Sequence, residues 1–167
     1  MRSHTMELPR KIVVGEKNIS GIGDFLKSLG DPKNVSLISG NNVKKIVEKK
    51  IEKSLCASKI KYIWHLAKTI DRKSIIEIEN KVQQNKSDLV VGIGGGRSVD
   101  IAKMIGFNID KPFVSIPTSA SHDGIASPFV SVKGDRPHSL VATAPLGVFV
   151  DVDIIKKAPR RLLASGC

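Results

Sequence analysis

The sequence contains few of the residues that mark secreted, membrane-spanning or base-stacking proteins. Its two cysteines, Cys56 and Cys167, stand far apart without CxxC spacing, which favours free thiols in a reducing cytoplasm over a disulfide framework. No apolar stretch is long enough to span a membrane. One tryptophan and one tyrosine leave little for stacking on bases, so the net charge of +11 is attributed to solvated helix surface. The same charge favours small anionic ligands.

The length of 167 residues is enough for one ordinary α/β domain. Residues 1–5 precede a second methionine, Met6, and lack an apolar signal core, so we interpret them as an expression scar. Residues 6–158 are predicted to form the α/β domain. Pro159 favours a new helix that the chain end cuts off, so residues 159–167 are interpreted as the start of a second, truncated domain.

Short apolar runs alternate with segments whose apolar residues recur at helical spacing. Strands are predicted at residues 11–14, 35–38, 59–63, 89–93 and 113–116, and helices at 19–29, 43–55, 75–82 and 97–105. This alternation predicts a Rossmann-like, doubly wound, mostly parallel sheet whose ligands lie beyond the carboxyl ends of the strands. Three later segments, 129–132, 140–142 and 148–150, are separated by turn residues and predict a small β-hairpin layer flanking the sheet.

The stretch Leu89–Asp100, read LVVGIGGGRSVD, predicts a strand that delivers a phosphate-binding turn. Its three consecutive glycines, residues 94–96, remove the Cβ atoms that would keep an anion away from backbone N–H groups. A helix that opens at Arg97 or Ser98 directs its unpaired N–H groups and its positive dipole end into the same turn.

Two better-known glycine signatures do not fit this stretch. The G-x-G-x-x-G fingerprint requires a third glycine where the sequence has Arg97 or Val99, and the P-loop pattern fails at the same place. A tight strand-to-helix turn without a ligand therefore stays open as an alternative.

Two further loops follow predicted strands. After the second strand, where dinucleotide-binding domains commonly place a carboxylate on the ribose, the sequence has Gly40 and Asn41. Without that carboxylate no charge repels a ribose 2′-phosphate, so the site is expected to tolerate NADP as well as NAD, a plain turn being the alternative. The strand at 113–116 ends in a hydroxyl-rich loop that carries His122 and Asp123.

Two motifs resemble a known family. The stretch GGGRSVD at 94–100, followed by Ala102 and Lys103, and the stretch PTSASHDGIASPFVSV at 117–132 resemble the sn-glycerol-1-phosphate dehydrogenases. These belong to the wider group of glycerol dehydrogenases, dehydroquinate synthases and iron-containing alcohol dehydrogenases. GGGxxxD marks the wider group, and SHDGIASP resembles the glycerol-1-phosphate branch. The resemblance covers residues 6–167 and corresponds to the amino-terminal, nucleotide-binding half of such enzymes.

The resemblance implies a second, helical domain with a catalytic zinc held by one Asp and two His residues. The first of these ligands is expected just beyond Cys167, so this chain is expected to hold no metal ligand. His122 and His138 do not form a familiar zinc pattern. His65 stands in an apolar run and is expected to be packed or solvated.

The resemblance also assigns roles to individual residues. The cofactor-binding residues that it implies are Gly94, Gly95, Gly96, Arg97, Ser98, Asp100, Thr118, Ser119, Ser127 and Ser131. Asp100 either supports the turn or contacts the cofactor, and Val130 or Ser131 lies along the nicotinamide. Asp123 is expected to accept a hydrogen bond from the substrate hydroxyl, the alternative being a turn-stabilising role. His122 either relays a proton or shapes the loop.

The implied reaction is reversible hydride transfer between NADPH or NADH and the carbonyl of dihydroxyacetone phosphate. Its product, sn-glycerol 1-phosphate, is the backbone of archaeal membrane phospholipids. The full-length enzyme is expected to be cytoplasmic and homo-oligomeric, to bind no nucleic acid and not to insert into the membrane. This part alone is expected to be inactive. The alternatives are a polyol dehydrogenase that acts on unphosphorylated glycerol, a dehydroquinate synthase-like cyclase and a non-catalytic nucleotide-binding module.

Overall fold

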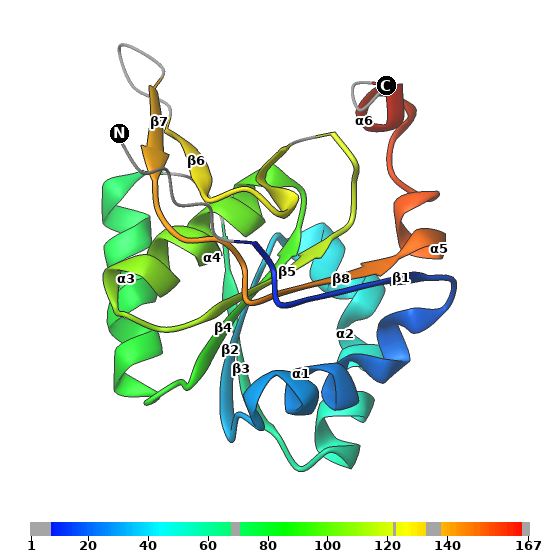
Figure 1. Cartoon of the computed structure of the whole chain (residues 1–167), viewed down its shortest axis with the longest axis horizontal. Helices are drawn as coiled ribbons and strands as arrows, with labels where there is room; N and C mark the ends of the chain where they lie inside the picture. The colour runs from blue at the N-terminus through cyan, green and yellow to red at the C-terminus, as the bar shows by residue number, and fades with distance from the viewer. Residues whose placement is uncertain (1–7, 68–70, 122, 133–137, 165–167) are drawn as a thin grey trace, which may run out of the picture.

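The computed structural model describes residues 8–67, 71–121, 123–132 and 138–164 (Figure 1). A six-stranded sheet with the order β1-β8-β5-β4-β2-β3 forms its centre, and all neighbouring strands pair in parallel. The strands are β1 (Lys11–Gly15), β2 (Asn34–Ser39), β3 (Lys61–Leu66), β4 (Leu89–Gly94), β5 (Phe113–Pro117) and β8 (Gly147–Asp151). The predicted parallel α/β sheet is confirmed.

Helices cover both faces of this sheet (Figure 1). The helices α1 (Ile22–Gly30) and α2 (Asn41–Ala57) pack on one face, and α3 (Arg72–Gln84) and α4 (Gly96–Asn108) pack on the other. A short 3-10 helix, η1 (Asn18–Gly21), leads into α1. The sheet is therefore doubly wound, as the alternating pattern predicts.

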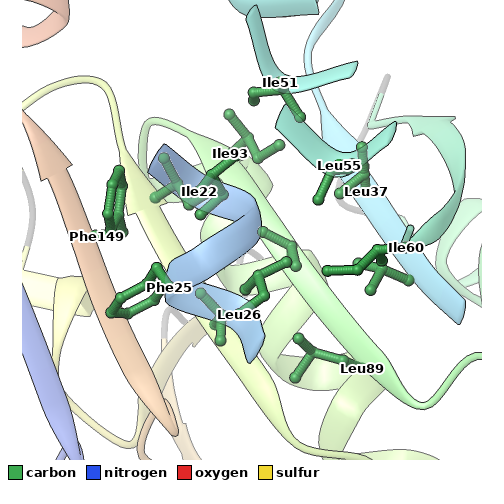
Figure 2. Close-up of a cluster of buried hydrophobic side chains, with 14 of the residues drawn as sticks. Ile22, Phe25, Leu26, Leu37, Ile51, Leu55, Ile60, Leu89, Ile93 and Phe149 are labelled. Atoms are coloured by element: carbon green, nitrogen blue, oxygen red, sulfur yellow. The ribbon is translucent and has the colours of Figure 1, made fainter. Parts of the chain in front are cut away.

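The core beneath α1 and α2 is built from apolar residues that recur at helical spacing (Figure 2). On α1, Ile22, Phe25 and Leu26 point at the sheet and are at most 4% exposed. The Phe25 ring lies 4.8 Å from that of Phe149 on β8, measured between centroids. Burial of one such side chain contributes about 2 kcal/mol, so this face anchors the helices that frame the site.

The last strand of the sheet corrects one prediction. Residues 148–150 are predicted in the β-hairpin layer, but β8 lies inside the sheet between β1 and β5. Its run Val148-Phe149-Val150 suits a strand buried on both faces as well as it suits a hairpin. Gly147 packs so closely on α1 that a Cβ there would lie 2.8 Å from Leu29 and from Phe25. Tertiary packing thus decides between the two placements.

A small hairpin does exist beside the sheet. It pairs β6 (Phe129–Val132) with β7 (His138–Val141) in antiparallel register, and α4 contacts both β6 and the 3-10 helix η2 (Asp123–Ile125) that precedes it. The hairpin layer is therefore confirmed for these two strands only. Two short helices, α5 (Val152–Ile155) and α6 (Arg160–Ala164), follow β8, and α6 begins directly after Pro159 as predicted. In the described part of the chain, none of the helices combines the length and the apolar character needed to cross a membrane.

Candidate cofactor-binding site

The candidate site lies at the carboxyl edge of the sheet, where three neighbouring strands end together. β4 pairs with β2 on one side and with β5 on the other, with Ile93 opposite Ser39 and Gly94 opposite Pro117. All three strands run in the same direction, so the residues that follow them meet at one edge. The three loops that the sequence singles out are thus brought together.

The glycine turn after β4 is shaped by backbone conformation. Gly94 has a φ of +147°, a conformation that residues with a side chain rarely adopt. A Cβ on Gly94 would lie 2.9 Å from Oγ of Ser98. The carbonyl of Gly94 accepts a hydrogen bond of 2.9 Å from the backbone N–H of Thr118, which joins this turn to the next loop. The turn therefore requires glycine at this position.

The first turn of α4 opens toward this edge. The helix begins at Gly96, one or two residues before the predicted start at Arg97 or Ser98, and its N-cap is Gly95. Among the described residues no side chain caps its first N–H groups, and its first turn carries no acidic residue. Such an end attracts an anion through its N-terminal N–H groups and its dipole. These features fit the pyrophosphate of a dinucleotide.

A pocket of about 580 Å³ connects this turn to the loop after β2. Its lining consists of Gly40, Asn41, Asn42, Val43, Leu66, Ala67 and Arg97. Gly40 is the N-cap of α2, whose first turn likewise has no side-chain cap and no acidic residue among the described residues. The pocket thus joins the N-termini of two helices and Arg97, and its described lining residues include no carboxylate. An adenosine ribose with or without a 2′-phosphate fits this chemistry.

The hydroxyl-rich loop after β5 contacts the glycine turn directly. A Cβ on Gly95 would lie 3.3 Å from Oγ of Ser119, which is itself 3.2 Å from Oγ of Ser121. Thr118 and Ser119 are buried, and Oγ of Ser127 accepts a hydrogen bond of 3.1 Å from the N–H of Phe129. Thr118 and Ser119 therefore lie at the turn, and Ser127 lies further along the same loop.

Several predicted site residues are less fully described. His122 lies outside the described residues. Asp123 begins η2 and Ser131 lies on β6 opposite Ser139, but their side chains are outside the described part. Ser98 and Asp100 are buried on the first turns of α4, with Oδ1 of Asp100 3.8 Å from Nζ of Lys103. The individual roles of these residues stay predictions.

Two buried charged residues at this edge are absent from the sequence-based site. Lys103 is fully buried, and its Nζ donates hydrogen bonds to the carbonyls of Gly124 and Phe129. Asp151, at the end of β8, accepts hydrogen bonds from the N–H groups of Ile19, Asp153 and Ile154. Two sequence features could have indicated them: Lys103 lies on the apolar face of a predicted helix, and Asp151 is an acidic residue at a strand end, where it can cap the following helix. Asp151 fixes the turn after β8.

His65 is packed, one of the two states expected of it, and lies on β3 away from the glycine turn. It is 6% exposed, and its Nε2 is 3.1 Å from Oγ of Ser36, which is 2.7 Å from Oγ of Ser87. Burial, and to a smaller extent the charge of Lys81, lowers the pKa of His65 to about 4. Its imidazole is therefore neutral at physiological pH. Cys56, as expected, is an exposed free thiol.

The zinc that the resemblance implies is expected to be held by residues beyond Cys167. No group of three or more His, Cys, Asp or Glu side chains in the described ranges is arranged to hold a metal ion. The proposed zinc ligands beyond Cys167 stay a prediction.

A family model and two sequence relatives that match this chain are all named as dehydrogenases. A sequence model of the family described as "Iron-containing alcohol dehydrogenase" matches residues 13–159. The protein named glycerol-1-phosphate dehydrogenase [NAD(P)+] from Nitrosopumilus maritimus is 65% identical, and the one from Cenarchaeum symbiosum is 62% identical. Both matches cover 100% of this chain and 47% of the relative, so the chain spans about half the length of these curated relatives.

Solved structures show the same fold at much lower sequence identity. A glycerol dehydrogenase from Schizosaccharomyces pombe superposes with a TM-score of 0.90 at 23% identity, over 99% of this chain and 43% of the other. An NADH-dependent butanol dehydrogenase A from Thermotoga maritima gives 0.86 at 18%, over 99% and 48%. These two similarities establish the fold.

Proposed function

The chain belongs to the iron-containing alcohol dehydrogenase family, and we propose that it is the cofactor-binding half of an sn-glycerol-1-phosphate dehydrogenase. In this proposal the full-length enzyme reduces dihydroxyacetone phosphate with NADPH or NADH for the synthesis of archaeal membrane phospholipids. The single observation that carries the cofactor role is the glycine turn, which combines Gly94 at a φ of +147° with the uncapped start of α4. The two relatives above 60% identity, both named for this activity, support the choice of substrate.

The dinucleotide is proposed to lie along the carboxyl edge. Its pyrophosphate would bind the N–H groups at residues 95–97, and its adenosine would enter the pocket lined by Gly40, Asn41 and Arg97. The nicotinamide would then extend toward the loop that holds Thr118, Ser119 and Ser127. The cofactor supplies or accepts the hydride when it is bound. The residues of this chain bind and orient it.

The substrate is proposed to approach the same loop from the side of Asp123. The carboxylate of Asp123 would accept a hydrogen bond from the substrate hydroxyl, and His122 would relay a proton or shape the loop. The net charge of +11 favours a phosphorylated substrate and an anionic cofactor. No catalytic step is assigned to a metal here, since the described residues contain no suitable ligand group. The metal-binding domain, the homo-oligomer and the cytoplasmic location belong to the proposed full-length enzyme.

The test is a reduction assay on the full-length protein with dihydroxyacetone phosphate and NADPH or NADH, with and without a chelator. We expect turnover that the chelator abolishes, together with oxidation of glycerol 1-phosphate in the reverse direction. Faster turnover of unphosphorylated glycerol than of glycerol 1-phosphate would instead identify a polyol dehydrogenase. Dinucleotide binding without turnover of either substrate would reduce the chain to a binding module.

A further inference from the structure

The most unusual buried group in the described structure is the side chain of Lys103. It is one of the largest fully buried side chains and lies on α4, seven residues after Gly96, at 0% exposure. A buried ammonium is unfavourable unless hydrogen bonds and a counter-charge compensate for its lost hydration. A lysine in this place therefore needs a specific set of partners.

The partners of Lys103 lie on two different segments. Its Nζ donates a hydrogen bond of 3.1 Å to the carbonyl of Gly124 and one of 2.7 Å to the carbonyl of Phe129. Oδ1 of Asp100, one turn earlier on the same helix, lies 3.8 Å away and supplies the opposite charge. The ring of Phe113 has its centroid 6.0 Å from Nζ. The ammonium is thus held by two backbone carbonyls of one loop and a carboxylate of its own helix.

The two carbonyls stand at opposite ends of the loop segment 124–129. This segment starts directly after Asp123, which is proposed to contact the substrate. It also contains Ser127, which is proposed to contact the cofactor. The helix that carries Lys103 starts at the glycine turn, where the pyrophosphate is proposed to bind. One side chain therefore fixes both ends of the substrate-side loop to the helix that carries the cofactor-side turn.

We propose that Lys103 is a positioning residue that sets the distance between bound substrate and bound cofactor. It acts through the loop at 124–129 and touches neither ligand itself. The inference rests on the proposed function for its kinetic consequences, but the anchoring of the loop can be measured without any activity. A shift of about 1 Å in such a loop is enough to reduce a rate by up to a hundredfold.

The test uses the full-length protein with Lys103→Met, which keeps the apolar stem and removes the donor, and Lys103→Gln, which keeps a shorter donor. Val82→Ala is the matched control, because Val82 is fully buried in the core shared by α3 and α4 and its truncation lowers stability without touching the loop. Exposed Lys45→Met controls for loss of one positive charge.

For Lys103→Met we expect the Kd for NADPH to stay within about threefold of the unmodified protein. The kcat/KM for dihydroxyacetone phosphate should fall by about tenfold to a hundredfold. Amide hydrogen exchange at 124–129 should be faster by a similar factor. Lys103→Gln should give values of kcat/KM and of amide exchange between those of Lys103→Met and the unmodified protein. Both controls should leave kcat/KM and exchange at 124–129 unchanged.

The inference is wrong if Lys103→Met behaves like Val82→Ala, with a lower Tm but unchanged kcat/KM and unchanged exchange at 124–129. If neither Lys103 variant folds, exchange in the unmodified protein decides: amides at 124–129 that exchange as fast as the chain ends contradict the anchoring. A protein that binds NADPH but does not reduce dihydroxyacetone phosphate refutes the proposed function alone. In that case the exchange rates still test the role of Lys103.

Discussion

The two loops that meet at the carboxyl edge of the sheet are held in place by different means. The turn after β4 is fixed by backbone conformation, with Gly94 at a φ of +147° and its carbonyl bonded to the N–H of Thr118. The loop after β5 is fixed largely by side chains, above all by Nζ of Lys103 bound to the carbonyls of Gly124 and Phe129. One half of the site is thus specified locally and the other from a distant helix.

Because of this difference, the turn after β4 should be sensitive to added side-chain volume, and the loop after β5 should be sensitive to the loss of polar or charged partners. A turn made by backbone geometry tolerates no added side chain but is indifferent to protonation. A segment held by buried polar side chains depends on every partner, since an unsatisfied buried group costs about 1–3 kcal/mol. The two kinds of region should therefore respond to different substitutions.

The largest effect is expected for Gly94→Val. The positive φ and the approach of a Cβ to within 2.9 Å of Ser98 Oγ together predict a loss of about 4 kcal/mol in the free energy of unfolding. The turn would also lose its capacity to bind NADPH, which a fluorescence titration measures. Gly30→Val is the matched control, because a Cβ at Gly30 meets nothing within 4 Å and that change should cost less than about 1 kcal/mol. Equal losses in the two variants would remove the special role of Gly94.

The second-largest effect is expected on the pH dependence of stability. It concerns the buried polar group formed by Ser36, His65 and Ser87. Burial lowers the pKa of His65 from 6.5 to about 4, so between these values the unfolded chain binds a proton that the folded chain does not. Stability should therefore be complete above pH 6.5 and should fall by about 3 kcal/mol as the pH drops to 4.

Urea unfolding at the two ends of this pH range measures the loss, and His65→Gln is the control. The variant should start less stable at high pH but should lack the part of the pH dependence that His65 contributes. Identical pH profiles in the two proteins would show that His65 keeps its ordinary pKa in the folded state. The backbone-held turn predicts no comparable pH dependence for NADPH binding across the titration of this histidine.

The sequence predicts the backbone-held half of the site more fully than the other half. Three consecutive glycines between an apolar strand and an amphipathic helix indicate the turn, because glycine is the residue that lacks a Cβ and can therefore be recognised directly in the sequence. The predicted start of α4, at Arg97 or Ser98, lies one or two residues after the observed start, because Gly96 is a weak helix former that the helix nevertheless includes. Local chemistry was sufficient here.

The parts that the sequence does not reveal depend on contacts between distant residues. The two carbonyls that Lys103 binds lie 21 and 26 positions away, and nothing in the local pattern of α4 predicts these two contacts. The segment 148–150 is predicted in the hairpin layer because a short apolar run fits either position. Its pairing with β1, more than a hundred residues earlier, decides the matter. Long-range packing therefore supplies the information that periodicity lacks.

A smaller effect is expected where the cofactor's adenosine is proposed to bind. The unmodified chain should bind NADPH and NADH comparably, because the described residues that line the pocket between Gly40 and Arg97 include no carboxylate. A Cβ on Gly40 meets nothing within 4 Å, so Gly40→Asp should fit and should weaken NADPH relative to NADH by about tenfold, or 1.4 kcal/mol. Gly40→Asn is the neutral control of the same size. A strong preference for NADH already in the unmodified chain would contradict this use of the pocket.

The smallest effect is expected for Ser119→Ala, at the point where the two loops touch. Oγ of Ser119 pairs with Oγ of Ser121 at 3.2 Å and lies 3.3 Å from the position of a Cβ on Gly95. Removing this hydroxyl should lower the free energy of unfolding by about 1 kcal/mol, because Ser121 keeps partial access to water. Since Gly94 still bonds Thr118 through the backbone, the turn should keep its shape and NADPH binding should weaken by less than about threefold. Chemical unfolding and a fluorescence titration measure the two quantities, with Ser58→Ala, a buried serine outside the proposed site, as the control. A loss of NADPH binding as large as that of Gly94→Val would mean that the Ser119 hydroxyl, rather than the backbone, holds the cofactor, and the contrast between the two loops would no longer stand.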